Sequence, residues 1–271
     1  MTNTVAERGL PVAASSARAG TQSLSRGLQL LRVVATRPKI GWRLSDLATA
    51  CRQEKATVHR ILARLVDERL VVQRPGDRHY LPGPLMFELG LALPDHAEFQ
   101  RRAEPLVHAF ARRMGGICLL QFRSGSEYVC SVRAGTLKLT GLMVYEGTRR
   151  PLFTSAGGVA ILQTLPPGEA HQILLENVAH EIARQGTGRL AALQKMRERS
   201  DSYGFGVNFG DVVPGSYAFG MPVRNTAGEA FAALCLVGTP DLLGEHRVEE
   251  LRRELQGAAN ALEAQAHDLG I

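Results

Sequence analysis

The feature that most constrains this sequence is a pair of short amphipathic helices, which a tight turn joins between residues 44 and 65. Apolar residues mark the buried face of each helix: Leu44, Leu47, Ala48 and Cys51 in the first, and Val58, Ile61, Leu62 and Leu65 in the second. The second set has the i, i+3, i+4, i+7 spacing of a helix that buries one face. Residues 52–54 are left for the turn. This pattern predicts a helix-turn-helix, a frame that lays its second helix in the major groove of DNA.

A β-hairpin is predicted directly after these two helices. Residues 70–74 and 79–81 read as strands, and residues 75–78, which include Pro75 and Gly76, have turn chemistry. Apolar residues at helical spacing also predict an earlier helix, with Leu24, Leu28, Leu31 and Val34 on its apolar face. A helix, a helix-turn-helix and a hairpin in this order form a winged helix-turn-helix, which we assign to residues 23–83.

Side chains that suit contact with nucleic acid lie on the outward face of the second helix and on the hairpin. They are Lys55, Thr57, His59, Arg60 and Arg64 on the helix, and Arg74, Arg78 and His79 on the hairpin. Lysine and arginine reach phosphates and guanine edges, and a threonine contacts a phosphate or a thymine methyl group. Any solvated helix also carries such charges, so this face alone does not establish DNA binding.

Four stretches of the first third resemble, in order, the DNA-binding domain of the IclR family of transcriptional regulators. They are residues 23–28, 44–48, 57–62 and 80–84. The resemblance implies a winged helix-turn-helix and adds Ser45 and Ala56 to the candidate DNA contacts. The chain departs from the family pattern at Ala56, where serine is usual, and at residues 52–54, where glycine, an apolar residue and proline are usual.

The segment after the hairpin, residues 85–93, is apolar nearly all round. Such a helix is unsuited to a solvated linker and needs partners on more than one side. We assign it to a linker helix over residues 84–98. It packs either on the chain's own domains or on a second copy of the chain, and we favour the second copy because palindromic operators bind two-fold symmetric proteins.

Strand and helix patterns alternate in the last two thirds of the chain, residues 99–271. After a helix that ends near Met114, strands are predicted over residues 117–123, 128–133, 217–223 and 230–237, and helices over residues 156–163, 168–176, 189–200 and 247–267. This order predicts an antiparallel sheet with helices packed on it, an α+β sensor domain. The resemblance continues through residues 147–158, 204–215, 221–224 and 232–238, and it implies a GAF/PAS-like effector-binding domain.

Ser155, Gly157 and Gly158 mark the start of a predicted helix. Glycines there would let a ligand approach free backbone N–H groups, and the helix dipole would favour an anion. An organic carboxylate is the expected ligand. The alternative is that the glycines let the helix pack closely on the sheet, and both interpretations remain open.

The resemblance also implies the other walls of this pocket. In relatives that bind small polar acids, an acidic residue and two serines line it, and these positions fall here on Asn208, Cys235 and Val237. Apolar and aromatic candidates around them are Met143, Tyr145, Phe153, Ala218 and Phe219. One anion-binding end and an apolar wall imply an aromatic or long aliphatic carboxylate rather than a glyoxylate-sized acid.

Charge is concentrated in the first third of the chain. Residues 1–90 hold 14 Lys and Arg against 7 Asp and Glu, whereas residues 91–271 hold 18 against 19. A basic first third fits a polyanion partner, although a merely soluble basic surface would have the same balance. We expect a homodimer or homotetramer that binds double-stranded, palindromic operator DNA and responds to a small organic acid. The alternative is an architectural DNA-binding protein without an effector.

Several other functions lack sequence support. No nucleophile elbow, zinc-protease helix or close Cys/His pair occurs, so an enzyme that uses Ser155 with a distant His171 or His180 is disfavoured. The four cysteines have no metal-finger spacing, and we expect buried thiols, no metal and no cofactor. Residues 1–22 contain no apolar signal core and are expected to be a disordered leader, and no apolar run is long enough to span a membrane. We therefore expect a cytoplasmic protein.

Overall fold

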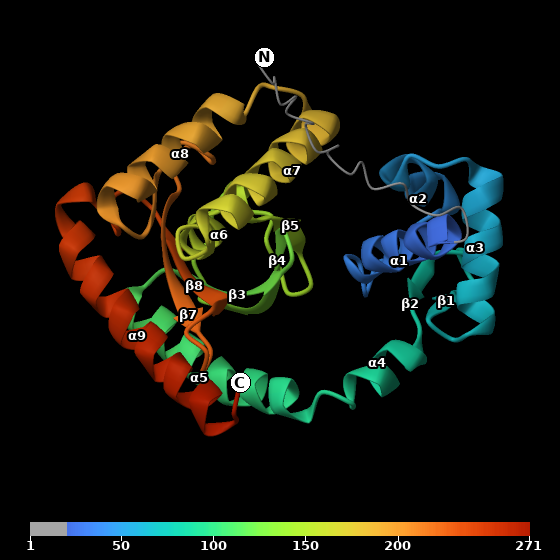
Figure 1. Ribbon diagram of the computed structural model, residues 1–271, viewed down its shortest axis with the longest axis horizontal. Coiled ribbons are helices and arrows are strands. Elements are labelled where there is room, and N and C mark those ends of the chain that lie inside the picture. The colour runs from blue at the N-terminus through green and yellow to red at the C-terminus, as the bar shows by residue number, and fades with distance from the viewer. Residues whose placement is uncertain (1–20) are drawn as a thin grey trace, which may run out of the picture. The chain divides into compact units, whose positions relative to one another are not determined.

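The computed structural model describes residues 21–271, which form two compact units (Figure 1). The first unit ends at Phe87, and the second is Glu88–Ile271. Most of the predicted leader, up to residue 20, lies outside the described residues, but Gln22 already belongs to the first helix. Within residues 21–271, no helix is both long and apolar enough to cross a membrane.

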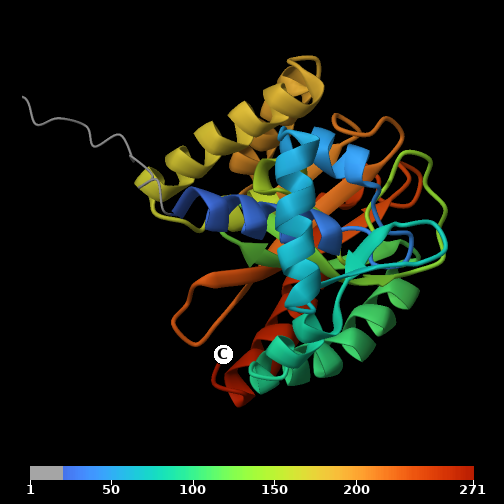
Figure 2. The ribbon, with the colours of Figure 1, turned by 90° about the vertical axis from the view of Figure 1, so that its right-hand side faces the viewer.

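The first unit is built from three helices and a hairpin. They are α1 (Gln22–Ala35), α2 (Leu44–Cys51), α3 (Lys55–Asp67), β1 (Val71–Gln73) and β2 (Tyr80–Pro82). Figure 2 looks onto α3, with α1 crossing behind it. Leu30, Leu47, Val58, Leu62 and Val71 are fully buried and join all of these elements except β2 in one core. The predicted winged helix-turn-helix fold is confirmed.

The apolar face of α1 differs from its prediction. Leu24 and Leu28 are 62% and 46% exposed, whereas Leu30 and Val34 are fully buried. The helix approaches α3 through Gly27, where an added Cβ would lie 3.6 Å from a methyl carbon of Ile61. The contact with α3 therefore decides which face of α1 is buried, and this face differs from the one that the spacing of apolar residues predicted.

The turn of the helix-turn-helix forms without the family's usual residues, and the wing is an antiparallel hairpin. Arg52 ends α2 in the left-handed conformation, with φ of 51° and ψ of 47°. A non-glycine residue pays about 1–2 kcal/mol for this conformation. In the wing, β1 and β2 pair antiparallel, with Val72 opposite Leu81, and Trp42 forms an isolated bridge to Tyr80. The unusual turn residues therefore raise the conformational free energy of the turn but do not change the fold.

The predicted linker helix over residues 84–98 is wrong in one respect, because this stretch contains the whole of one helix and the start of another. Helix α4 (Pro84–Gly90) ends before Leu91, and α5 (Pro94–Met114) begins at a proline. Proline has no backbone N–H to donate, so it suits the first turn of a helix and interrupts a continuous one. The helix predicted to end near Met114 begins at Pro94 and is 21 residues long.

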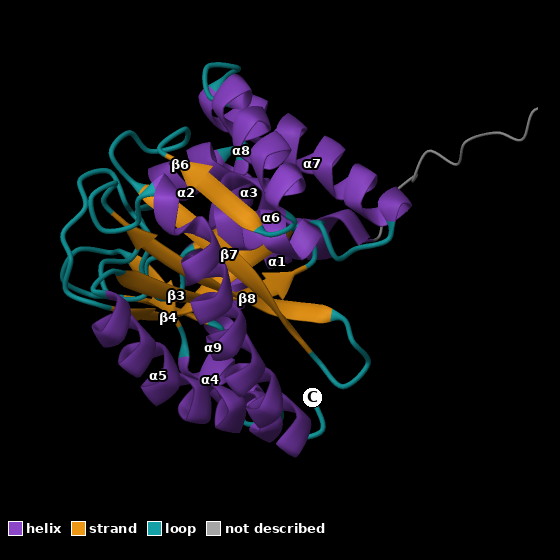
Figure 3. Cartoon of the chain, turned by 90° about the vertical axis from the view of Figure 1, so that its left-hand side faces the viewer, coloured by secondary structure: helices purple, strands orange, loops and turns teal. Residues whose placement is uncertain are grey.

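The second unit contains a six-stranded antiparallel sheet in the order β5-β4-β3-β8-β7-β6. The strands are β3 (Ile117–Ser124), β4 (Glu127–Ala134), β5 (Arg149–Pro151), β6 (Gly206–Phe209), β7 (Tyr217–Arg224) and β8 (Ala230–Gly238). The helices that follow α5 are α6 (Ala156–Leu162), α7 (Pro167–Gln185), α8 (Leu190–Tyr203) and α9 (Val248–Asp268). Helices α5 and α9 lie on one face of the sheet, and α6, α7 and α8 lie on the other (Figure 3).

Side chains of the central strands point alternately to the two faces of the sheet. Leu120 and Leu234 belong to the core beneath α5 and α9, whereas their neighbours Leu119 and Cys235 belong to the core beneath α6. This is the period of two that strands impose. Both faces are covered by helices, which confirms the predicted α+β class.

Candidate nucleic-acid interface and effector pocket

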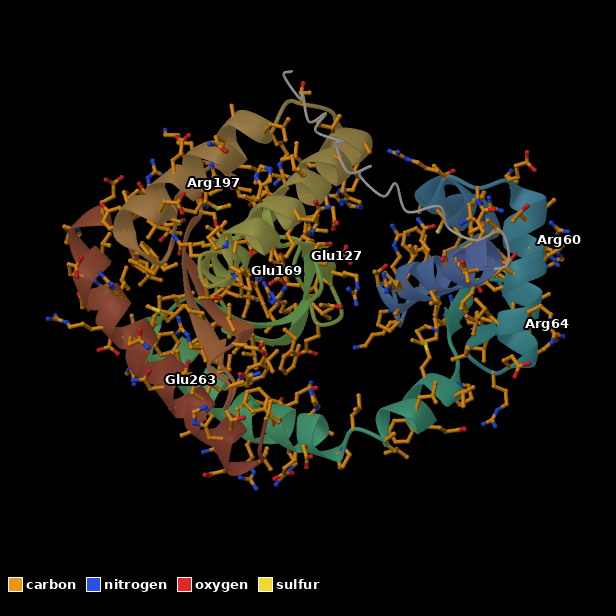
Figure 4. All side chains as sticks on the ribbon, viewed as in Figure 1. Arg60, Arg64, Glu127, Glu169, Arg197 and Glu263 are labelled. Carbon is orange, nitrogen blue, oxygen red and sulfur yellow. The ribbon has the colours of Figure 1, made fainter. Side chains whose placement is uncertain are left out.

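Within the described part of the chain, the outward face of α3 carries one arginine that forms no ion pair and one that is paired with acidic residues. Arg60 and Arg64 both project from α3 away from the core of the unit (Figure 4). Nη1 of Arg64 lies 3.1 Å from a carboxylate oxygen of Asp67, and its Nη2 lies 3.7 Å from Glu68. Among residues 21–271, no ion pair or hydrogen bond involves the exposed side chain of Arg60. Arg60 is therefore available to a ligand, whereas the charge of Arg64 is already balanced.

The other predicted α3 contacts vary in exposure. Lys55, Ala56 and His59 are exposed, and Thr57 is half-buried. His59 borders a recess of about 360 Å³ together with Ser45 and Arg78, so helix α2, helix α3 and the wing meet there. Arg43, which precedes α2 and was not predicted, borders the same recess. A basic residue directly before a helix-turn-helix helix was the available sequence signal.

Arg74, predicted to contact DNA, is a structural residue of the wing. Its guanidinium donates to both carboxylate oxygens of Asp77, at 2.9 and 2.6 Å, and to the backbone carbonyls of Lys39 and Ile40. These hydrogen bonds hold the pKa of Asp77 well below its usual range. His79 is also engaged, because its Nδ1 lies 2.9 Å from Asp77. Of the three predicted wing residues, Arg78 alone has an exposed side chain without an ion pair in the described part of the chain.

A pocket of about 80 Å³ lies between the sheet of the second unit and the start of α6. Its apolar lining comes from the sheet, from residues 142–144, from α8 and from the loop after β6: Leu119, Leu142, Val144, Ala156, Met196, Val212, Val213, Ala218, Cys235 and Val237. Its polar lining is Gln121, Tyr128, Arg150, Thr154, Ser155, Arg189, Asn208 and Ser216. The lining contains two arginines and no acidic residue, so the pocket suits an anion with an apolar body.

Three of the polar groups lie on the neighbouring strands β5, β4 and β3. Arg150 on β5 is paired with Tyr128 on the neighbouring strand β4, and Gln121 lies on the next strand, β3. Tyr128 is 1% exposed, and burial raises the pKa of its phenol, which therefore remains protonated. Nε of Arg150 and Nε2 of Gln121 are buried with no hydrogen-bond partner among residues 21–271. These strands therefore offer unused donors to a ligand.

The second arginine is held from outside the pocket. Nη1 of Arg189, which precedes α8, donates to Oε1 of Glu181 on α7 at 3.0 Å. The Glu181 side chain is completely buried, and its Oε2 has no partner in the described structure. Glu181 therefore fixes the position of Arg189 while balancing its charge. Neither residue was predicted, because they come together only through the folding of α7 and α8.

Gly157 and Gly158, in the first turn of α6, allow close packing, which was the alternative left open above. A Cβ on Gly158 would lie 2.0 Å from the carbonyl oxygen of Leu152, and one on Gly157 would lie 2.2 Å from Oε1 of Gln121. The Gly158 N–H donates to Oγ of Ser155 at 3.0 Å. This amide already has an acceptor, and neither glycine lines the pocket of the second unit, so effector contact at Gly157 and Gly158 stays a prediction. Ser155 itself does line the pocket.

The remaining predicted effector residues divide between the pocket and other places. Asn208, Ala218, Cys235 and Val237 line the pocket, and their contact with an effector stays a prediction. Phe219 faces the α9 side, where its ring centroid lies 6.2 Å from that of Phe205. It cannot share a pocket with Ala218, because adjacent strand residues point to opposite faces.

Three further residues of the predicted wall lie elsewhere. Phe153 is buried in a separate cluster with Leu152 and Val159. Met143 and Tyr145 are 62% and 53% exposed, and Leu142 and Val144 line the pocket in their place. Asn208 lines the pocket but also accepts a hydrogen bond from the backbone N–H of Asp211 at 3.1 Å, so it caps a local turn.

No group of three His, Cys, Asp or Glu side chains within residues 21–271 is arranged to hold a metal ion. The four cysteines are buried and unpaired. Burial raises the pKa of Cys130 and of Cys235 to about 12. Cys235 therefore contributes to the pocket as a small apolar thiol rather than as a nucleophile.

Comparison with known proteins assigns both units. The model of the IclR helix-turn-helix domain matches residues 23–75, and that of the bacterial transcriptional regulator IclR C-terminal domain matches residues 92–264. The chain is 24% identical to the HTH-type transcriptional regulator BhcR of Paracoccus denitrificans, over 90% of this chain and 86% of that protein. It is 24% identical to the HTH-type transcriptional repressor AllR of Escherichia coli K12, over 97% and 98%.

Solved structures have the same fold. The crystal structure of an IclR family transcriptional regulator from Brucella abortus superimposes with a TM-score of 0.67 at 19% identity, over 89% of this chain and 91% of that one. An IclR regulator from Alicyclobacillus acidocaldarius gives a TM-score of 0.65 at 21% identity, over 90% and 98%. The chain therefore belongs to the IclR family of transcriptional regulators, which are not enzymes, and combines a DNA-binding helix-turn-helix with the family's effector-binding domain.

Proposed function

We propose that α3 enters the major groove of an operator and that Arg60 is its principal base-reading side chain. A free guanidinium forms two parallel hydrogen bonds to a guanine edge, the commonest specific contact of this kind. Lys55, Ala56, Thr57 and His59 lie beside it on α3. Arg64 contributes less, because Asp67 and Glu68 balance its charge.

We propose phosphate contacts around the recess that Ser45, His59, Arg78 and Arg43 border. Three of these side chains are cationic or become so when protonated, and they come from three different elements. Phosphate contacts orient a protein on DNA without reading its sequence. The role of Arg74 and His79 is to fix the wing rather than to touch the operator.

We propose that the protein acts as a homo-oligomer, a dimer or a tetramer, and that residues 84–98 take part in the contact between copies. Phe87, Leu89, Leu91 and Leu93 are between 57% and 71% exposed in the single chain. Four large, exposed apolar side chains within residues 87–93 are typical of an interaction site. Two-fold symmetry would match a palindromic operator.

We propose that the effector is a carboxylate with an apolar body, bound in the pocket between the sheet and α6. Arg150 faces its negative charge, Arg189, whose own charge Glu181 balances, adds hydrogen-bond donors to the lining, and the apolar lining faces the rest. A water needs about 10–15 Å³ of such space, so the cavity holds on the order of six non-hydrogen atoms. This size fits an aromatic ring or a short aliphatic chain, with the carboxylate at the partly exposed arginines.

The single observation that supports this proposal is the pair of arginines in a pocket lining without acidic residues. Thermal shift of the full chain with benzoate, hexanoate and glyoxylate tests it. We expect benzoate and hexanoate to raise the melting temperature and glyoxylate to have little effect, because glyoxylate has no apolar body to bury against the apolar lining. Stabilisation by glyoxylate alone would overturn the proposed ligand class. No response to any carboxylate would favour an architectural protein.

A further inference from the structure

Gln121 is a completely buried amide in the middle of an apolar strand. Its neighbours along β3 include Leu119, Leu120 and Phe122, and its side chain lies on the pocket side of the sheet. A buried side-chain amide normally has all its polar atoms hydrogen-bonded, because desolvation without a partner is unfavourable. Gln121 departs from this rule, and the departure lies in the pocket wall.

The hydrogen bonds of Ser155 identify which amide atom lacks a partner. Oγ of Ser155 accepts the Gly158 N–H at 3.0 Å and donates to Oε1 of Gln121 at 3.3 Å. With Oε1 assigned by this bond, Nε2 is the atom without a partner among residues 21–271. A side-chain NH₂ group can only donate. The group that it is suited to bind is therefore an acceptor, such as an oxygen.

Gln121 and Arg150 occupy well-separated positions on the sheet. They lie two strands apart and two residues out of register, since Arg150 is paired with Tyr128 and Gln121 with Cys130. With strands about 4.8 Å apart and residues about 3.4 Å apart along a strand, their backbones are separated by roughly 12 Å. A ligand whose carboxylate lies against Arg150 would bring the far end of its body toward Gln121.

We infer that the effector carries a second hydrogen-bond acceptor, an oxo or hydroxyl oxygen on its apolar body, which binds Nε2 of Gln121. The inference rests on the proposed carboxylate pocket and adds a specificity residue to it. The ligand class is then a carboxylic acid with one oxygen substituent remote from the carboxylate. A purely hydrocarbon body would leave the buried N–H groups of Gln121 unpaired. A site that is built to hydrogen-bond one ligand group discriminates strongly against an analogue that lacks that group.

Calorimetry with the full chain and two isosteric pairs tests this inference. One pair is 4-methylpentanoate and 4-oxopentanoate, and the other is 4-methylbenzoate and 4-hydroxybenzoate, so that an oxygen replaces a methyl group in each. We expect the oxygen-bearing member to bind at least five-fold more tightly in at least one pair. Equal or tighter binding of the methyl member in both pairs would overturn the inference and leave the carboxylate pocket intact. Failure of all four acids to bind would remove the carboxylate pocket as well.

Two substitutions connect the preference to Gln121. Gln121→Glu keeps the shape and the acceptor for Ser155 but removes the N–H donor, and Gln121→Met removes both polar atoms. The measured quantity is the affinity ratio within a pair, which a general loss of affinity does not change, and far-UV circular dichroism checks that each variant is folded. We expect the ratio to fall below two-fold in both variants. A ratio that persists in both would show that another group reads the oxygen.

Discussion

Replacing Gly158 with alanine tests how closely α6 packs on the preceding backbone. A Cβ at this position would lie 2.0 Å from the carbonyl oxygen of Leu152 and 2.7 Å from its carbonyl carbon. Ordinary contact begins near 3.4 Å, so backbone must shift by about 1.4 Å, the difference between 3.4 and 2.0 Å. Overpacking of this kind costs about 1–3 kcal/mol, and we expect about 3 kcal/mol because both groups are main chain.

The expected change is large enough to measure in a thermal melt followed by circular dichroism. At about 2–4 °C per kcal/mol, the second unit of the Gly158→Ala variant should melt about 6–12 °C below the parent. Gly257→Ala in α9 is the matched control, because a Cβ there meets no atom within 4 Å. Alanine stabilises a helix interior by about 0.5–1 kcal/mol relative to glycine, so this variant should melt slightly higher. A Gly158→Ala variant that melts within 2 °C of the parent would refute the close-packing argument.

Three further predictions concern the surface and the thiols. Arg60→Ala should weaken operator binding in a gel-shift titration by about 1–3 kcal/mol, and the paired Arg64→Ala should cost less; equal losses would contradict the assignment. Leu89→Asp should lower the mass measured by light scattering, because it introduces a charge into an apolar contact, and an unchanged mass counts against that contact. The thiols of Cys130 and Cys235 each have a pKa near 12. They should therefore resist iodoacetamide at pH 8 in the native protein and react with it in urea; labelling of the native protein would contradict their burial.

The longer strands of the second unit could be predicted closely from the sequence. Strands predicted over residues 117–123 and 230–237 end within one residue of β3 and β8, because apolar runs bounded by turn residues are strong local signals. The strands β5 and β6 were not predicted. The first has only three residues and the second four, and neither has an apolar run long enough to be distinguished from a loop.

The pocket was harder to predict than the sheet, since its polar groups come from distant parts of the sequence. Arg150 and Arg189 follow no shared pattern, and only folding brings them to one lining. Two signals were nevertheless present. First, adjacent strand residues point to opposite faces of a sheet, so Ala218 and Phe219 cannot both line the pocket. Second, Gln121 is a polar residue within an apolar strand, which is typical of a buried amide with a specific hydrogen-bond partner.

The most direct test of the proposed function is the operator affinity of the full chain with and without a saturating carboxylate effector, compared with that of Arg150→Ala. Fluorescence anisotropy with operator DNA selected from a random library supplies the measurement. The effector should change the affinity of the parent several-fold, since coupling between two sites is commonly about 1–3 kcal/mol. Arg150→Ala should bind the DNA as the parent does without effector and should not respond to it. An affinity that the effector leaves unchanged, or an Arg150→Ala variant that responds like the parent, would contradict a ligand-responsive regulator with this pocket.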